Sequence, residues 1–290
     1  MFQKHPKAIF IQLTTACNAA CINCPHPFTY GKNGYHKKGV MSENVWSSLV
    51  EQLKRARYRG QVGLYLHSEL LLAKDLYDRI SDINMNTRAF VVLSTNAALL
   101  NETNRNKLIA AKPKKVHINI NSADKEQYER MTGLDYDTTF ENTDKFIQEA
   151  RYSISIEVNC PVLPGVDTYK LSKRFSLVHV NTKFWATSRG GLVQGVSAKG
   201  KRSRFSIRKY CMQPRQNLNV LWDGGIILCC ADWAHESQSD FPNIRDTNLF
   251  ETYKGPLMTQ LRKELKQGNY SRYKMCHICA DEMDFYRGTR

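Results

Sequence analysis

The sequence predicts an α/β fold, in which a partial (β/α)6 barrel is followed by a small C-terminal α+β domain. Three observations support this fold class. Short apolar runs alternate with segments of helical periodicity over the first two thirds of the chain, which is the pattern of parallel strands joined by crossover helices. Several runs end in polar residues, where the active sites of such sheets lie. Most of the nine cysteines fall into two groups, one early and one late.

The predicted elements follow one another as β/α units. The first strand, residues 8–13 (AIFIQL), leads into a cysteine-rich loop. A helix begins after Ser42, which is a good N-cap, and a second helix is expected at residues 73–85. The other predicted strands are residues 62–66, 89–93, 115–120 and 154–158, with the sixth at either 177–180 or 183–186. Five or six such units give a partial β/α barrel.

The first cysteine group has the spacing C-x3-C-x2-C and comprises Cys17, Cys21 and Cys24. Three thiolates on one loop can bind three irons of a cubane 4Fe–4S cluster and leave the fourth iron without a protein ligand. Zinc sites favour C-x2-C pairs with two further ligands nearby, and that pattern is not completed locally. The loop therefore predicts a cluster with one open iron, with free thiols or zinc as the alternatives.

This three-cysteine loop after a first strand resembles that of the radical S-adenosylmethionine (radical SAM) superfamily. The resemblance implies that the open iron binds S-adenosylmethionine and that the cofactor is cleaved to a 5′-deoxyadenosyl radical. The radical then removes hydrogen from a C–H bond of the substrate. It also implies a reducing electron donor, such as flavodoxin or ferredoxin.

The segment His67-Ser68-Glu69-Leu70 stands where the family carries a Gly-Gly-Glu-Pro-type motif. The resemblance implies that Glu69 binds the methionyl ammonium of the cofactor, because a carboxylate and an ammonium form charge-assisted hydrogen bonds. Ser68 in place of the second glycine and Leu70 in place of the proline are departures that bear on cofactor affinity. The alternative for Glu69 is a carboxylate favoured at a helix N-terminus.

Further cofactor-binding residues are implied at the ends of later strands. Ser94 and Asn96 are candidates for the methionyl carboxylate or the ribose, and Asn119 for the ribose hydroxyls. An amide suits ribose because it both donates and accepts hydrogen bonds. Polar residues at strand ends also cap the following helix, and this role remains an alternative.

The second cysteine group reads C-x17-C-C-x45-C-x2-C and comprises Cys211, Cys229, Cys230, Cys276 and Cys279. An Asp-Gly turn predicts a hairpin that delivers Cys229, and one helix is expected at residues 249–265. Four sulfurs in this spacing suit zinc or an iron–sulfur cluster. The pattern resembles the twitch or abbreviated SPASM domain of radical SAM enzymes. The resemblance implies one auxiliary 4Fe–4S cluster on Cys211, Cys229, Cys276 and Cys279, with Cys230 as a substitute for Cys229.

The chain is therefore expected to divide into a barrel (1–196), a basic linker (197–209) and an auxiliary cluster domain (210–290). The linker is rich in Lys and Arg and has no acidic residue. A solvated linker and an anion-binding loop at the barrel mouth are both consistent with that composition.

The composition limits the class of protein. The formal net charge is +15, from 42 Lys and Arg against 27 Asp and Glu, which favours a partner or substrate that carries negative charge. No run of about 18 apolar residues is present, so a membrane span is not expected. Because no secretory signal is recognisable and the cysteines are grouped like ligands, we expect reduced thiols and a cytoplasmic location.

The predicted function is that of a radical SAM oxidoreductase with one auxiliary cluster that assists oxidation or binding of the substrate. Asp232 and His235 follow the second cysteine group closely and are candidates for removing a proton from the substrate. The substrate is either a peptide side chain or an anionic small molecule such as a nucleotide. The alternative is a non-enzymatic zinc or iron–sulfur protein that binds nucleic acid through its basic surface.

Overall fold

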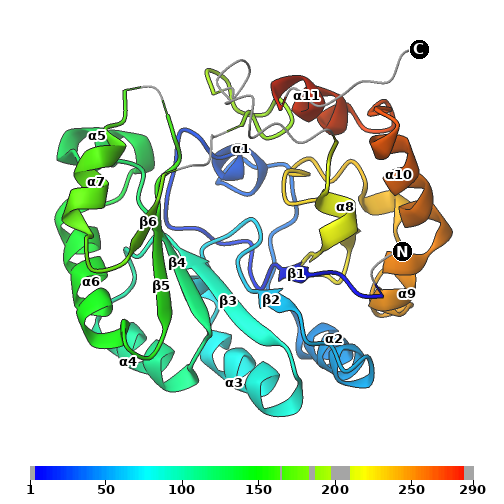
Figure 1. The fold of residues 1–290 in the computed structure, drawn as a ribbon, viewed down its shortest axis with the longest axis horizontal. Coiled ribbons are helices and arrows are strands. Elements are labelled where there is room, and N and C mark those ends of the chain that lie inside the picture. The colour runs from blue at the N-terminus through cyan, green and yellow to red at the C-terminus, as the bar shows by residue number, and fades with distance from the viewer. Residues whose placement is uncertain (1–3, 164, 183–186, 197–209, 284–290) are drawn as a thin grey trace.

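The computed structural model describes residues 4–163, 165–182, 187–196 and 210–283, and an eight-stranded sheet runs through its centre (Figure 1). The strands are β1 (Ala8–Ile11), β2 (Gln61–Gly63), β3 (Phe90–Thr95), β4 (Lys115–Asn119), β5 (Ser155–Asn159), β6 (His179–Asn181), β7 (Asn217–Val220) and β8 (Ile226–Ile227). Their order is β6-β5-β4-β3-β2-β1-β7-β8. All neighbours are parallel except β7 and β8. The predicted α/β partial barrel is confirmed.

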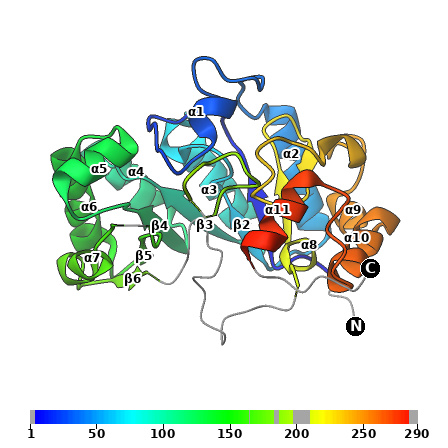
Figure 2. The same cartoon turned by 90° about the horizontal axis from the view of Figure 1, so that it is seen from above.

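Helices connect the parallel strands, and all of them except the first, which follows Cys24 and lies at the barrel mouth, cover the outer face of the sheet (Figures 1 and 2). They are α1 (His26–Thr29), α2 (Glu43–Arg55), α3 (Leu76–Asn86), α4 (Glu102–Ala111), α5 (Lys125–Thr132), α6 (Tyr136–Ala150) and α7 (Thr168–Arg174). Ser42 caps α2 as expected, accepting a hydrogen bond from the Val45 backbone. The sixth strand overlaps the first of its two expected positions, and the other, 183–186, lies outside the described residues.

The C-terminal segment adds the antiparallel hairpin β7–β8 to the barrel sheet, because β7 pairs with β1 in parallel register. The helices of this segment are α8 (Gln213–Gln216), α9 (Leu249–Lys254), α10 (Pro256–Lys266) and α11 (Lys274–Glu282). The expected linker, 197–209, lies outside the described residues. We keep the division of the chain at this linker as a proposal, since the hydrogen-bonded sheet joins the segments on its two sides.

The single helix expected at residues 249–265 is two helices, so that prediction was wrong. Gly255 separates α9 from α10 and has an extended backbone, with φ −62° and ψ 167°. Pro256 is the cause, because a proline forces the residue before it out of the helical region, whereas it fits the first turn of a new helix.

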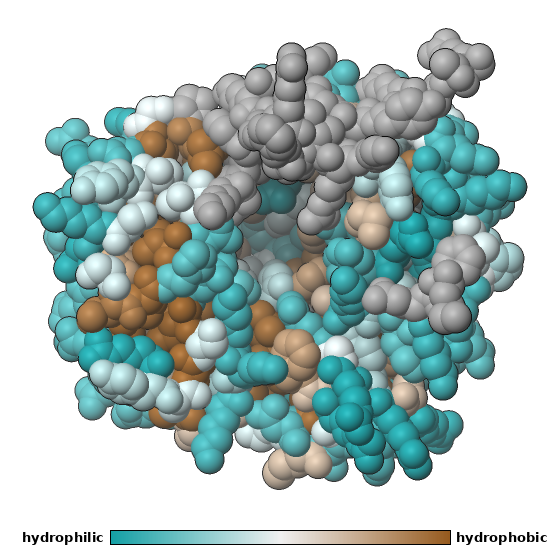
Figure 3. Space-filling model, in the orientation of Figure 1, coloured by the Kyte–Doolittle hydropathy of each residue, from teal (hydrophilic) through white to brown (hydrophobic). Residues whose placement is uncertain are grey.

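The barrel has an apolar outer layer and a partly polar interior. In β3 and β4, Val91, Leu93, Val116 and Ile118 are fully buried and share a core with the apolar faces of the surrounding helices. Successive residues of a strand face opposite sides of the sheet, so the residues between them face the barrel interior. In β3, Phe90 and Val92 on this face are apolar, whereas the residues nearer its carboxyl end and those in β4 and β5 are polar and half-buried: Ser94, Lys115, His117, Asn119 and Glu157. Figure 3 shows the molecule hollowed near its centre on this side.

Within the part of the chain that the structure describes, none of the helices combines the length and apolar character needed to cross a lipid bilayer.

The seam between β1 and β7 makes a testable contribution to stability. Leu218 in β7 is fully buried opposite Ile9 in β1. Replacing Leu218 with Ala removes buried methyl groups and leaves a cavity, so the free energy of unfolding should fall by about 2–5 kcal/mol. The measurement is denaturant unfolding of the purified protein. Leu177→Ala is the control, because Leu177 is 61% exposed, and a change there as large as at Leu218 would contradict the expected role of the seam.

Candidate active site

The loop that carries Cys17, Cys21 and Cys24 begins at the end of β1 and is fixed by its own backbone. The N–H groups of Ala20 and Ile22 donate to carbonyl oxygens in the last turn of α5, at 2.8 and 3.0 Å. Burial, together with a smaller contribution from the neighbouring charged groups, raises the pKa of Cys17 and Cys21 to about 12. A thiol with a raised pKa keeps its proton until a metal binds, because the metal displaces the proton when it bonds to the sulfur.

Glu69 follows β2 and lies beside this loop, since its charge contributes to the raised pKa of Cys17. The side chain is buried, and burial raises the pKa of its carboxyl group. Its oxygens accept hydrogen bonds from the Leu71 N–H at 3.2 Å, the Thr95 hydroxyl at 2.7 Å and the Asn96 N–H at 2.8 Å. An ionised carboxylate offers about four acceptor positions. One position therefore remains for an ammonium group, as the resemblance implied.

The structure brings Ser94 and Asn119 together and separates them from Asn96. The Asn119 amide donates to the Ser94 hydroxyl at 2.8 Å across β3 and β4. Asn96 instead donates to the side-chain oxygen of Asn18 in the cysteine loop at 2.8 Å, and its own oxygen accepts from the Ala98 N–H. Ser94 and Asn119 thus face the barrel mouth, whereas Asn96 connects β3 to the cysteine loop.

A cavity of about 360 Å³ joins these strand ends to the cysteine loop. Its wall contains two cysteines of the loop, the Ser94–Asn119 pair and residues from β1, from the segment that follows β2 and from the C-terminal segment. The wall includes Phe10, Cys21, Cys24, Tyr65, His67, Ser94, Asn119, Asn121, Arg189, Cys230 and Trp233. The polar strand ends and the first cysteine group therefore share one space.

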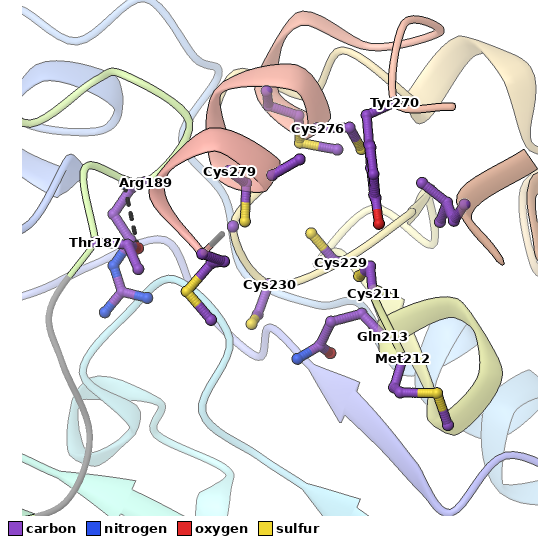
Figure 4. Close-up of a pocket in the computed structure, with 15 residues that line it drawn as sticks. Thr187, Arg189, Cys211, Met212, Gln213, Cys229, Cys230, Tyr270, Cys276 and Cys279 are labelled. Carbon is purple, nitrogen blue, oxygen red and sulfur yellow. Dashed lines mark hydrogen bonds between the residues drawn. The ribbon is translucent and has the colours of Figure 1, made fainter. Parts of the chain in front are cut away.

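A second cavity, of about 390 Å³, lies among the late cysteines. Figure 4 shows the sulfur atoms of Cys211, Cys229 and Cys279 pointing into one space with Cys276 beside it, whereas the sulfur of Cys230 points away. Burial raises the pKa of Cys229, Cys276 and Cys279, with further contributions from the other thiols of the group. This arrangement favours Cys229 over Cys230 as a ligand.

Two thiols of the first group line the first cavity, and the thiols of the second group line the second cavity. Among the described residues, no three His, Cys, Asp or Glu side chains form a group that could hold a metal ion. A cubane cluster carries its irons at the corners of a cube, so its cysteine ligands stand around the cluster volume. The thiols around the second cavity, from two hairpin-side residues and two residues of α11, fit such a cluster.

Arg189 and Cys230 line both cavities. Arg189 has a left-handed backbone, with φ 52°, in a turn held by the buried Glu282 carboxylate, which accepts hydrogen bonds from the Ser188 N–H at 3.1 and 3.2 Å. Among the described residues that line the two cavities, Arg189 is the only Lys or Arg. Sequence reasoning did not select it, and its position after the last barrel strand was the available signal.

Asp232 and His235 lie beside the second cysteine group and outside the described walls of both cavities. The buried Asp232 carboxylate accepts from the Glu236 N–H at 2.9 Å, the Ser237 N–H at 3.1 Å and the Ser237 hydroxyl. His235 shares a hydrogen bond of 2.9 Å with the Tyr30 hydroxyl. Their role in proton removal remains a proposal, and the structure shows Asp232 stabilising the turn that follows Cys230.

Two family models match the chain: the Radical SAM superfamily over residues 11–168 and the SPASM iron–sulfur cluster-binding domain over residues 211–280. The chain belongs to the radical SAM superfamily. It is similar to the S-adenosyl-L-methionine-dependent 2-deoxy-scyllo-inosamine dehydrogenase of Niallia circulans, with 22% identity over 275 residues, 93% of this chain and 91% of that protein.

Solved structures share the fold of this radical SAM protein. BtrN in complex with AdoMet and 2-DOIA aligns with a TM-score of 0.67 and 18% identity over 95% of this chain and 93% of that one. SuiB of Streptococcus suis bound to the precursor peptide SuiA aligns with a TM-score of 0.72 and 13% identity over 99% of this chain and 76% of that one. At these identities the likeness shows the fold.

Family membership confirms the predicted enzyme class and cofactors. This radical SAM enzyme binds a 4Fe–4S cluster and S-adenosylmethionine, its SPASM domain binds auxiliary iron–sulfur, and it requires a reductant. The enzymatic interpretation therefore replaces the alternative of a non-enzymatic nucleic-acid-binding protein. The individual ligands and cofactor contacts described above are our proposals for how this chain holds these groups.

The two neighbouring cysteines allow a direct test of the auxiliary ligands. After anaerobic reconstitution, the wild-type protein should hold about eight irons, and Cys229→Ser should lose up to about four, because its sulfur faces the other thiols. Cys230→Ser is the matched control and should keep the wild-type iron content. Iron and sulfide are measured together with the visible absorption spectrum. Equal losses in both variants would contradict the assignment.

Glu69 offers a test of cofactor binding. Replacing Glu69 with Gln keeps the shape but removes the charge, so a charge-assisted hydrogen bond worth about 1.5–3 kcal/mol is lost. The dissociation constant for S-adenosylmethionine should rise about tenfold or more, as measured by equilibrium dialysis of the reconstituted protein. Glu51→Gln, an exposed carboxylate on α2, should leave it unchanged. An unchanged affinity in Glu69→Gln would show that its role is confined to binding the backbone of β3.

Proposed function

We propose that this radical SAM enzyme oxidises a hydroxyl-bearing carbon of a small, oxygen-rich substrate that is neutral or anionic, such as a cyclitol or its phosphate. The observation that carries the proposal is the first cavity, which extends from Cys21 and Cys24 to the wall formed by Arg189 and Cys230. Arg189 and Cys230 also line the second cavity. A substrate held there lies between the two groups of thiols.

When bound, S-adenosylmethionine and the two clusters supply a carbon radical that takes one hydrogen atom and an acceptor for one electron. The chain itself supplies position and exclusion of water. Removal of a single hydrogen is useful only if one C–H bond is held in place, which requires several directional contacts. The hydrogen-bonded Ser94–Asn119 pair provides such contacts at the barrel mouth.

The cavity wall suits a polyol in both its polar and its apolar parts. Ser94, Asn119 and Asn121 offer donors and acceptors for hydroxyl groups. Phe10 and Tyr65 form an aromatic pair with ring centroids 5.3 Å apart on the same wall. Aromatic faces pack against the C–H face of a saturated ring while its hydroxyls point toward polar groups. A small ring with hydroxyls at its rim satisfies both kinds of contact.

Charge sets the expected preference among polyols. Arg189 has no ion pair with any of the described carboxylates, and it supplies the positive charge of the cavity wall. A guanidinium binds phosphate or carboxylate through two parallel hydrogen bonds. An anionic substrate should therefore bind better than a neutral one, and a cationic amine should bind worst.

The relatives support the reaction class and leave a second substrate class to be tested. The Niallia circulans protein is named as a dehydrogenase of an aminocyclitol, and it aligns over nearly the whole chain. SuiB is described with a precursor peptide, so peptides remain the second class. For the electron donor we propose an acidic flavodoxin or ferredoxin, because a net charge of +15 favours such a partner.

The test is an anaerobic assay with dithionite and S-adenosylmethionine, in which myo-inositol, its 1-phosphate and 2-deoxy-scyllo-inosamine are compared. We expect 5′-deoxyadenosine and a ketone in equal amounts, with kcat/KM falling from phosphate to neutral to amine. Arg189→Gln should raise KM for the phosphate about tenfold or more, because it removes a charge-assisted contact. Deuterium on the oxidised carbon should appear in 5′-deoxyadenosine.

Arg59→Gln is the matched control, since Arg59 is exposed before β2, at the other end of the strands from the site. It should leave all three KM values unchanged. Cofactor cleavage without oxidation of any cyclitol, but with a modified peptide, would replace our substrate class by the second one. A preference for the amine that survives in Arg189→Gln would contradict the role of Arg189.

A further inference from the structure

His67 occupies a costly backbone conformation at the edge of the first cavity. Its φ is 55°, in the left-handed region that non-glycine residues rarely adopt. The side chain is only 5% exposed and lines the cavity. Left-handed non-glycine residues persist where the surrounding contacts fix them, and they concentrate at functional sites. The contacts of the imidazole ring show what fixes this residue.

Two contacts fix the tautomer and the plane of the ring. The Nε2 atom lies 2.8 Å from the Cys230 carbonyl oxygen, and because a carbonyl can only accept, Nε2 carries the hydrogen. The ring stacks on Trp233, with centroids 3.8 Å apart and an angle of 20° between the planes. Burial keeps the imidazole neutral, because it lowers the pKa of His67 to about 3. The Nδ1 atom therefore presents a lone pair.

That lone pair has no hydrogen-bond partner among the described residues, although Nδ1 is buried. A buried acceptor without a partner is costly, and in native proteins such atoms are commonly satisfied by water or by a ligand. The residues that contact the His67 ring, Cys230 and Trp233, line the same cavity as Arg189. The ring therefore lies on the side of the cavity near the second cysteine group. Because His67 lines the cavity, a molecule bound there is the candidate donor to Nδ1.

We propose that His67 Nδ1 accepts a hydrogen bond from the substrate hydroxyl that undergoes oxidation, and so distinguishes the alcohol from its ketone. This inference rests on the proposed function, since it assigns one contact of the substrate in the same cavity. An alcohol can donate to Nδ1, whereas the ketone can only accept. A site built around a fixed acceptor discriminates strongly against a molecule that cannot donate, because the buried acceptor is then left unpaired.

The experiment separates the two ring nitrogens with two substitutions. His67→Asn places an amide oxygen near the position of Nδ1, and Asn tolerates a left-handed backbone. His67→Gln reaches the position of Nε2 and keeps a donor to the Cys230 carbonyl but loses the Nδ1 acceptor. Calorimetry on the reconstituted protein, with S-adenosylmethionine and without reductant, measures affinity for the cyclitol that turns over fastest in the assay above and for its ketone.

The wild-type protein should bind the alcohol roughly tenfold tighter than the ketone. His67→Gln should abolish this preference and His67→Asn should keep part of it, with the affinity for S-adenosylmethionine unchanged in both. If His67→Gln keeps the preference, or if wild type binds alcohol and ketone equally, the inference is overturned while the proposed function stands. Loss of S-adenosylmethionine binding in both variants would assign a structural role and overturn it too. Failure of wild type to bind any cyclitol contradicts the proposed function and the inference together.

Discussion

β1 is hydrogen-bonded along both of its edges, to β2 on one side and to β7 on the other. The first cysteine loop begins where β1 ends, and the hairpin that leads to Cys229 begins with β7. The register that places Ile11 beside Val220 therefore determines how far apart the two cysteine groups lie. Backbone pairing fixes this separation more rigidly than side-chain packing between separate domains, because each ladder bond restrains both chains. Arg189 and Cys230 line both cavities within this arrangement.

A buried carboxylate connects the other side of the site. Glu69 accepts hydrogen bonds from the end of β3 through Thr95 and Asn96, and its own N–H donates to the Ala16 carbonyl at the start of the cysteine loop. Burial of an ionised carboxyl group costs several kcal/mol unless such donors compensate. These donors offset part of that cost, and they hold the strand ends and the loop in their relative positions before the cofactor binds. Binding then uses a preformed site and spends little on ordering it.

The sequence predicted most reliably what depends on local pattern. The spacing of Cys17, Cys21 and Cys24 is a short local motif, and strand ends such as Ser94 and Asn119 follow from apolar runs. The break at Gly255 was also local, but helical periodicity on both sides of Pro256 concealed it. The partners of these residues depend on packing between distant segments.

His67 and Arg189 show why those partners escaped prediction. His67 contacts Cys230 and Trp233 more than 160 residues later, as set by the pairing of β1 with β7. Likewise, no sequence spacing indicates that Arg189 faces two cavities at once.

The structure also refines the meaning of the net charge of +15, which favours a partner or substrate that carries negative charge. Arg189 alone supplies positive charge to the described cavity walls, so substrate preference depends on one guanidinium. The other described Lys and Arg residues lie outside these walls, where their charge acts at longer range on an approaching acidic partner and falls off with ionic strength. Salt should therefore weaken reduction by a protein donor far more than it weakens substrate binding, because the cavity charge is screened less than the surface charge.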